Sequence, residues 1–427
     1  MNARHIAAAI ALIVAPDPGN LFAQIILRVA SPELTYSSSP RGNGMGGAEA
    51  TLPASDAAGT IANPGQLGLF SLDNLFSAST YTPKTKMLPS LDLPYTMSVS
   101  ALNAGLNLKD LLSLPFNAGI GVGYSRTYVD RGEFLITGPS GPTPIGTAAW
   151  NETYENYSVG LGLDYYVRLG IGMNFKQITS RIPGIRGDGT FGELTATPSA
   201  TDFGILMDIP VPDIVTGVSG MPLSIAKGID PFLDVSLCYV KLNVGGEVKY
   251  ADPQQRDPLP RTATLGIGLE GGISAVAGKT KWRMVSFSIA RQADDILVNA
   301  HIDGTFDYKG GVGDLSIGDN LFTGRPTGNV IVRKGWEIGA AEFLYIRGGS
   351  VKGQNYDYAT SGYSICLGGL VRLLEYAVPA SAEVPWVAFI GDHVDVQYLS
   401  ATYANPASLW DGTTFKGLNV VFHGVPW

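Results

Sequence analysis

Residues that could perform chemistry are few in this sequence, and their spacing does not fit a catalytic site. Residues 266–271 match the glycine pattern G-x-G-x-x-G, which binds dinucleotides where it joins a strand to a helix. Here the glycines lie inside an alternating strand pattern and no helical pattern follows. His393, Asp395 and Gln397 share one predicted strand face, but a single histidine there is more typical of a polar wall than of a metal site. We therefore expect no enzymatic activity, no cofactor and no metal.

The composition excludes several classes of protein and favours a β-rich chain. Net charge is −8 and the isoelectric point is near 5.1, which disfavours nucleic-acid binding. Two cysteines are too few for a disulfide scaffold, and 45% hydrophobic residues are too many for a disordered chain. Glycine occupies 54 of 427 positions and charged residues only 15%. Because long apolar runs are lacking after residue 23, a helical membrane protein is not expected.

Residues 1–23 have the features of a signal peptide. Arg4 precedes an uninterrupted apolar run, residues 6–15, and a breaker region follows at 16–19. Such a run is too short to span a bilayer. We predict export and cleavage after Ala23; the alternative is a helix of the mature protein.

The elements that would position any site show a two-residue alternation, which places alternate side chains on opposite faces of a strand. The faces predicted to meet lipid carry apolar residues, namely Tyr157, Val159, Leu161, Leu163, Tyr165, Leu169, Ile171, Met173 and Phe175. The faces predicted to line a lumen carry small or polar residues, namely Ser158, Gly160, Gly162, Asp164, Asn174, Lys176, Thr264, Gly266, Gly268 and Glu270.

Two features favour a membrane barrel over a secreted sandwich or β-solenoid, which also alternate. The small faces carry mostly glycine, serine, threonine and asparagine, rather than the lysine and glutamate that normally cover a solvated sheet. Tyr157 and Tyr165 bracket one strand, and eight steps of about 3.3 Å at a tilt of about 40° span roughly 20 Å, close to the apolar band of an outer-membrane barrel. We predict an all-β fold, a 14-stranded antiparallel transmembrane β-barrel, whose strands include 359–371 and 386–400.

An even strand count places both mature termini on the periplasmic side. The longest connections then lie on the outer face, among them 129–154 and 293–332. The predicted organisation is a signal peptide at 1–23, a plug or hatch segment at 24–72 and a barrel at 73–427.

The segment before the barrel is rich in glycine and small residues, which would let it fold inside a narrow lumen. Asn63 is held extended by Pro64. The alternative is a flexible surface leader. The predicted plug residues are Gly44, Met45, Gly46, Gly47, Asp56, Asn63, Pro64 and Gly65.

These motifs resemble the N-terminal signature of the FadL/PorV superfamily of outer-membrane β-barrels. The matching residues are Gly44–Ala48, Asp56-Ala57 and Asn63-Pro64, with Gly65 where the family usually has alanine. Residues 79–83, 259–269 and 342–349 resemble later segments of the PorV/PorQ-like branch, which is favoured.

The resemblance implies a fourteen-stranded barrel with an N-terminal plug in the outer membrane of a Gram-negative-type bacterium. FadL-type members pass long-chain fatty acids or other hydrophobic molecules inward, and PorV-type members escort exported cargo in type IX secretion. We expect outer-membrane lipid and a hydrophobic small molecule as partners, with secreted cargo and secretion-machinery proteins as the alternative. Lys176 and Arg372 are inward charges that would anchor the plug or, alternatively, bind a fatty-acid carboxylate.

Overall fold

The computed structural model describes residues 29–424 apart from residues 55, 82–83, 92, 138–143, 186–189, 221–222, 227, 251–255, 278–279, 302–304, 354–355, 379–380, 382 and 406–407. The predicted signal peptide, 1–23, lies outside the described residues, as does the beginning of the predicted plug.

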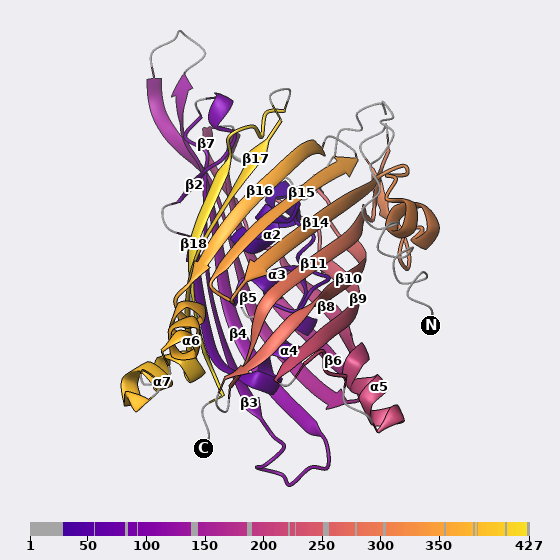
Figure 1. Cartoon of the computed structure of the whole chain (residues 1–427). Coiled ribbons are helices and arrows are strands. Elements are labelled where there is room, and N and C mark those ends of the chain that lie inside the picture. Colours follow the sequence, from indigo (N-terminus) through magenta and orange to yellow (C-terminus); the bar gives the residue numbers. More distant parts are fainter. Residues whose placement is uncertain are drawn as a thin grey trace.

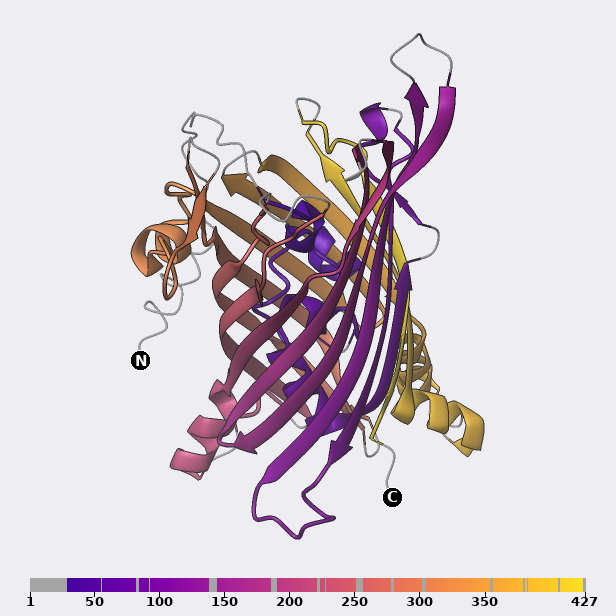
Figure 2. The ribbon, with the colours of Figure 1, turned by 180° about the vertical axis from the view of Figure 1, so that it is seen from behind.

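Fourteen antiparallel strands form a closed barrel wall (Figures 1 and 2). The wall strands are β1 (Asn74–Tyr81), β3 (Thr96–Asn107), β4 (Asn117–Thr137), β5 (Pro144–Tyr165), β6 (Val167–Ile185), β8 (Ser199–Pro210), β9 (Ile229–Gly245), β10 (Thr262–Ala277), β11 (Thr280–Ile296), β14 (Val330–Ala340), β15 (Leu344–Gly353), β16 (Tyr356–Cys366), β17 (Val394–Ala404) and β18 (Thr414–His423).

The first and last strands close the wall. β1 pairs with β18 over seven residue positions and with β3 over five. Two short strands, β2 (Thr85–Lys86) and β7 (Phe191–Ala196), extend the sheet beside β3 and β6. The fold class and the count of fourteen wall strands are therefore confirmed.

An apolar belt surrounds the wall, as the alternation predicts. On β5, Tyr157, Leu161 and Tyr165 are 55%, 44% and 65% exposed, whereas Gly160 and Gly162 between them are buried. Aromatic residues at both ends of an apolar stretch are typical of the two membrane interfaces of such barrels. The chain is an outer-membrane β-barrel. None of the helices among the described residues is long and apolar enough to cross a membrane.

Short helices lie inside the wall and outside it. They are η1 (Pro32–Thr35), α2 (Pro40–Gly44), α3 (Gly59–Ala62), α4 (Gly65–Asp73), η2 (Pro89–Leu91), α5 (Val211–Ser219), η3 (Ile317–Thr323), α6 (Leu367–Ala377) and α7 (Pro385–His393). Of these, η1 and α2–α4 precede the wall, and α4 leads directly into β1.

Two predicted strands are wrong over part of their length. Residues 367–371 begin helix α6, and 386–393 belong to α7. The apolar residues Leu367, Leu370 and Leu374 recur at the spacing of a helix. Leu367 and Val371 also continue the odd-position alternation of β16, which is why the sequence predicts a strand there.

Two predicted outer connections contain regular structure. Most of 129–154 belongs to β4 and β5, which continue beyond their neighbours as a hairpin (Figure 1). The 293–332 connection contains β12 (Val298–Ala300), paired with β13 (Phe306–Tyr308), and η3. Arg291 on β11 donates hydrogen bonds to the carbonyls of Leu321 and Phe322 at 3.0 and 2.8 Å. These bonds hold η3 against the wall.

The rim where β1 begins and β18 ends is called the inner rim, because the even strand count assigns it to the periplasmic side. The outer rim is at the opposite end of the wall. The first described residues lie at the outer rim, because the Ala30 N–H donates to the Pro258 carbonyl at 2.9 Å and the rings of Tyr36 and Trp410 are 5.0 Å apart. The predicted mature N-terminus, residue 24, lies outside the described residues, so its periplasmic placement stays a prediction. The described chain begins at the outer rim. The segment before β1 runs the length of the lumen.

Placing a charge in the belt tests the lipid contact. Leu161→Arg should lower the free energy of unfolding in lipid vesicles by about 2–4 kcal/mol, because a cation at the middle of the bilayer loses hydration. Denaturant titration measures this change in the free energy of unfolding. Leu409→Arg, on an exposed outer loop, is the control. Equal small effects of both changes would contradict a lipid-facing belt.

Candidate functional site

The candidate site is the lumen together with the segment that fills it, residues 29–73, which we call the plug. In both ribbon views the plug helices lie inside the wall (Figures 1 and 2). Ser39 caps α2 by accepting the Gly42 N–H at 3.4 Å, and Pro40 begins that helix. Pro64 separates α3 from α4 because proline cannot continue a helix hydrogen-bond ladder. The Asn63 side chain then accepts the Gly65 N–H at 2.9 Å.

Glycines on the inner wall allow the plug main chain to lie directly against it. A Cβ atom added at Gly162 would come within 2.1 Å of the Gly68 carbonyl oxygen, and one at Gly170 within 2.1 Å of the Gly65 carbonyl oxygen. Both separations are far below van der Waals contact. Among the predicted lumen residues, the glycines contact the plug on two sides of the barrel: Gly160 and Gly162 meet α4, and Gly266 and Gly268 meet Thr51 and Leu52.

The predicted glycine-rich motif of the plug packs against β14–β16. The Gly46 N–H donates to Thr360 Oγ1 at 2.9 Å, and this hydroxyl donates to the Gly44 carbonyl at 2.9 Å. Gly46 and Gly47 have φ of 67° and 73°, which only glycine adopts readily. The side chain of Met45 is buried. The motif is therefore a tight turn that fits one place on the wall.

The second plug motif is held by side-chain hydrogen bonds. Asp56 accepts the Ser39 hydroxyl at 2.7 Å and the Gly59 N–H at 2.8 Å. Asn63 donates to the Ala50 carbonyl at 2.9 Å, and Pro64 contacts the wall, where a Cβ at Gly172 would lie 2.1 Å from its carbonyl oxygen. Gly65 is buried at the start of α4. All eight predicted plug residues thus lie inside the lumen.

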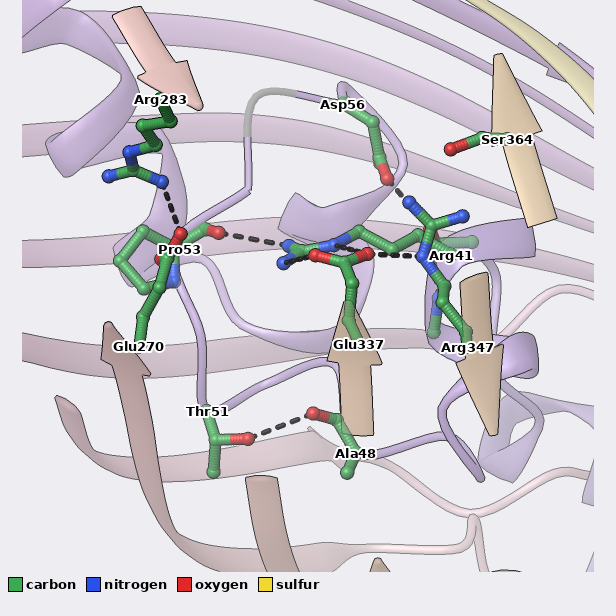
Figure 3. Close-up of polar contacts among 12 residues, drawn as sticks. Arg41, Ala48, Thr51, Pro53, Asp56, Glu270, Arg283, Glu337, Arg347 and Ser364 are labelled. Carbon is green, nitrogen blue, oxygen red and sulfur yellow. Dashed lines mark hydrogen bonds and ion pairs between the residues drawn. The ribbon is translucent and has the colours of Figure 1, made fainter. Parts of the chain in front are cut away.

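An ionic cluster that the sequence analysis missed joins the plug to the wall (Figure 3). Arg41 in α2 donates to both carboxylate oxygens of Glu337 on β14, at 3.1 and 3.3 Å. Arg347 on β15 donates to the same carboxylate, and Arg41 also donates to the Pro53 carbonyl at 3.0 Å. One carboxylate therefore links a plug arginine to a wall arginine. The alternation of Trp336, Glu337 and Ile338 could have placed Glu337 on the inner face of the wall. It could not have identified Arg41 as the partner of Glu337.

Another plug carboxyl is strongly affected by its surroundings. Burial, and then the neighbouring charge of Asp56, raise the pKa of Glu49 to about 8. Glu49 Oε1 accepts the Ser38 N–H at 3.2 Å. The Glu49 carboxyl is therefore mainly protonated at neutral pH, which removes repulsion between two acids inside the plug.

The predicted polar wall residues are mostly buried and paired. Lys176 forms an ion pair with Asp202 at 3.1 Å, and Asn174 donates to Asp202 at 3.1 Å and to the plug carbonyl of Thr60 at 3.1 Å. Thr264 donates to Asp294 at 2.7 Å. Ser158 is buried and Asp164 is half-buried near the inner rim, whereas Glu270 pairs with Arg283.

Neither cation proposed for a fatty-acid carboxylate is positioned for that role. Lys176 is occupied by Asp202. Arg372 lies on α6, where it pairs with Glu342 at 2.9 Å and Asp395 at 3.1 Å. Both side chains are also buried, at 5% and 8% exposed, so neither presents a free face to a ligand.

The predicted lipid-facing residues lie on the outer side of β5 and β6. Those that are exposed are Tyr157, Val159, Leu161, Tyr165, Met173 and Phe175, and those that are half-buried are Leu163, Leu169 and Ile171.

Two cavities lie at opposite ends of the plug. The outer cavity, about 580 Å³, opens at the outer rim between Ala30, Pro32, Arg131, Trp150, Tyr250 and Phe306. The inner cavity, about 270 Å³, is lined mostly by charged residues, among them Arg168, Asp208, Asp234 and Arg283. The first has aromatic walls and charges of both signs, with Arg131 and Arg256 beside Glu152 and Asp257. The second is a polar vestibule.

The outer cavity is built around Arg131, another residue that the sequence analysis missed. Its guanidinium lies over the rings of Trp150 and Tyr95, at 4.7 and 5.6 Å from their centroids. It also pairs with Glu33 of the plug and with Glu152 at 3.5 Å. This arrangement ties the outer end of the plug to the mouth of the barrel.

The fold and site define a plugged outer-membrane β-barrel. Among the described residues, no group of three or more histidine, cysteine, aspartate or glutamate side chains could hold a metal ion. No protein-family model and no curated protein matches the sequence.

Solved barrels resemble the chain only distantly. The toluene transporter TbuX of Ralstonia pickettii is 11% identical, with 90% of this chain and 97% of that one covered at a TM-score of 0.41. The toluene transporter TodX of Pseudomonas putida is 8% identical, with coverage of 91% and 96% at 0.39. The β domain of the Bordetella autotransporter BrkA is 9% identical, with coverage of 82% and 99% at 0.35. Structural similarity of this degree establishes neither the family nor the function of this chain.

A methyl group on the inner wall tests the plug contact. Gly162→Ala should displace α4 and lower the free energy of unfolding by about 1–3 kcal/mol, the usual cost of overpacking. Gly146→Ala on the same strand is the matched control, because its Cβ would have its nearest contact at 3.9 Å. Thermal unfolding and proteolysis of residues 29–73 measure the effect. Equal behaviour of the two variants would contradict direct packing of the plug main chain.

Removing the shared carboxylate tests the ionic cluster. Glu337→Gln leaves Arg41 and Arg347 without their counter-charge and should destabilise the plug by about 3–5 kcal/mol. Hydrogen exchange in residues 40–53 should accelerate, while exchange in β4 and β5 stays slow. Glu383→Gln on an exposed turn is the control. Unchanged exchange in the plug would show that the cluster does not retain it.

Proposed function

We propose that the protein binds hydrophobic molecules with an acidic head, such as long-chain fatty acids, at its outer rim and passes them across the outer membrane without catalysis. The outer cavity carries this proposal. Its volume lies within the range of about 300–1,000 Å³ typical of small-molecule sites. Trp150 and Phe306 offer apolar surface, and Arg131 offers a cation beside it.

Passage requires the plug to shift, since it lies between the two cavities. The contacts that retain it are unequal. Near the inner rim the plug main chain packs against wall glycines, whereas at the outer rim it is held through the Glu33–Arg131 pair. A carboxylate entering the outer cavity would compete with Glu33 for Arg131. Binding would thereby loosen the outer end of the plug first.

A second candidate is a PorV-like role in type IX secretion, in which the barrel escorts cargo at the outer face. The observation that favours it is the ordered structure in the 293–332 connection. There the β12–β13 pair and η3 lie outside the wall, and Ile317 and Phe322 are exposed. Binding a partner protein requires an exposed surface of this kind, and it does not require a channel through the lumen.

Ligand binding in lipid nanodiscs separates these candidates. Trp150→Ala should raise the Kd of a fluorescent long-chain fatty acid about tenfold, which corresponds to the loss of about 1.4 kcal/mol of aromatic contact. Tyr165→Ala, at the inner rim, is the control and should leave the Kd unchanged. Absence of saturable binding by the unaltered protein would contradict fatty-acid passage. If deletion of residues 298–323 leaves exported cargo proteins undocked at the cell, while binding of the fatty acid is unchanged, this result would favour the secretion role.

A further inference from the structure

Helices project outward from the inner rim on two sides of the barrel. Figure 1 shows α6 and α7 on one side and α5 on the other, and Figure 2 shows the same separation from behind. All three lie at the end of the wall where the chain terminates. They occupy connections that are short turns in most outer-membrane barrels.

The polarity of α6 is inverted relative to that of a helix on a soluble protein. Its polar side faces the barrel, where Arg372 is buried and pairs with Glu342 and Asp395. Its apolar side faces outward, with Leu374 47% exposed, and Leu367 and Leu370 on the same side are also exposed. A helix in water buries its apolar stripe. The environment outside α6 must therefore be apolar.

The exposed face of α6 continues the lipid-facing belt. Along β16, Tyr363 and Ile365 point outward, and Leu367 follows at the same alternation where the helix begins. The rings of Tyr376 and Trp282 of β11 are 5.4 Å apart, which fixes the helix beside the wall. On α7, Trp386 is 66% exposed, and Phe389 is also exposed. Aromatic residues of this kind are enriched at membrane interfaces.

Helix α5 has the same character on the opposite side. None of its residues is buried, and Val218 is 86% exposed. Val215 within the helix and Ile225 beyond it are exposed as well, and Asp213 is the single charged residue of the helix. With so little packing against the wall, this helix needs another surface to cover its valines.

We propose that α6–α7 and α5 are interfacial helices that lie in the periplasmic leaflet of the outer membrane and bind its phospholipids. Continuity with the belt selects lipid as the occupant. A membrane boundary surrounds the barrel at one height and would cover helices on both sides. Amphipathic helices at an interface bury their apolar face about 5–10 Å into the boundary between headgroups and acyl chains. The helices would then fix the depth and tilt of the barrel.

Site-directed spin labelling of the full-length protein in phosphatidylcholine–phosphatidylglycerol vesicles tests this proposal. Nitroxides at Leu374→Cys and Trp386→Cys, in a Cys238→Ser/Cys366→Ser background, should be more accessible to oxygen than to a water-soluble nickel complex. A label at Tyr157→Cys in the belt is the lipid reference, and one at Leu409→Cys on the exposed outer loop is the water reference. Nickel accessibility like that of the Leu409 label would overturn the proposal. So would labels shielded from both reagents, because these would indicate a protein partner or a second copy.

Tryptophan quenching gives an independent measurement that needs no cysteine substitution. Brominated phospholipids should quench part of the fluorescence of the unaltered protein, and Trp386→Phe should remove a quenchable component. Trp410→Phe changes a residue at the outer rim that packs against the rings of Tyr36, Tyr358 and Tyr403. This change should leave the quenchable component in place. If Trp386→Phe does not change the quenchable fraction, α7 does not touch lipid.

Discussion

The contact between plug main chain and wall main chain is the constraint on which the rest of the structure depends. A lumen enclosed by fourteen strands has little room for a folded segment of 45 residues, 29–73, once ordinary side chains project inward. Glycine at positions such as 162, 170 and 172 removes those side chains where Pro64 and α4 pass. The high glycine content is therefore a packing requirement, and it explains why the inward faces look too small for a solvated sheet.

Where the plug does not rest on glycine, charge and hydrogen bonds retain it. Arg41 and Arg347 share Glu337, Asn174 reaches the Thr60 carbonyl, and Arg131 pairs with Glu33. Such contacts are strong only while their partners remain in place, since a buried charge without a counter-charge is costly. Plug and wall are thus joined by interactions that a charged ligand can exchange, whereas an apolar interface would offer a ligand nothing specific to replace.

Much of the wall could be predicted from the sequence because alternation reports directly on which face each residue occupies. The outward residues of β5 and β6, the inward glycines and the number of wall strands all followed from that single period. It failed at 367–371, where Leu367 and Val371 continue the odd-position alternation of Tyr363 and Ile365 although they belong to helix α6. The partners inside the lumen could not be predicted. Arg41 and Glu337 are 296 residues apart, and only the closed wall brings them together.

The wall is sealed between its first strand and its last, and the plug is attached directly to that first strand. β18 pairs with β1, so the cylinder cannot be completed before the whole chain has been exported. Until then the sheet is open, and residues 29–73 can settle against its concave side without threading through a finished ring. The order of assembly therefore explains how the plug comes to lie inside the barrel: it is enclosed when β1 and β18 pair. After that, the plug can leave the lumen only along the axis of the barrel.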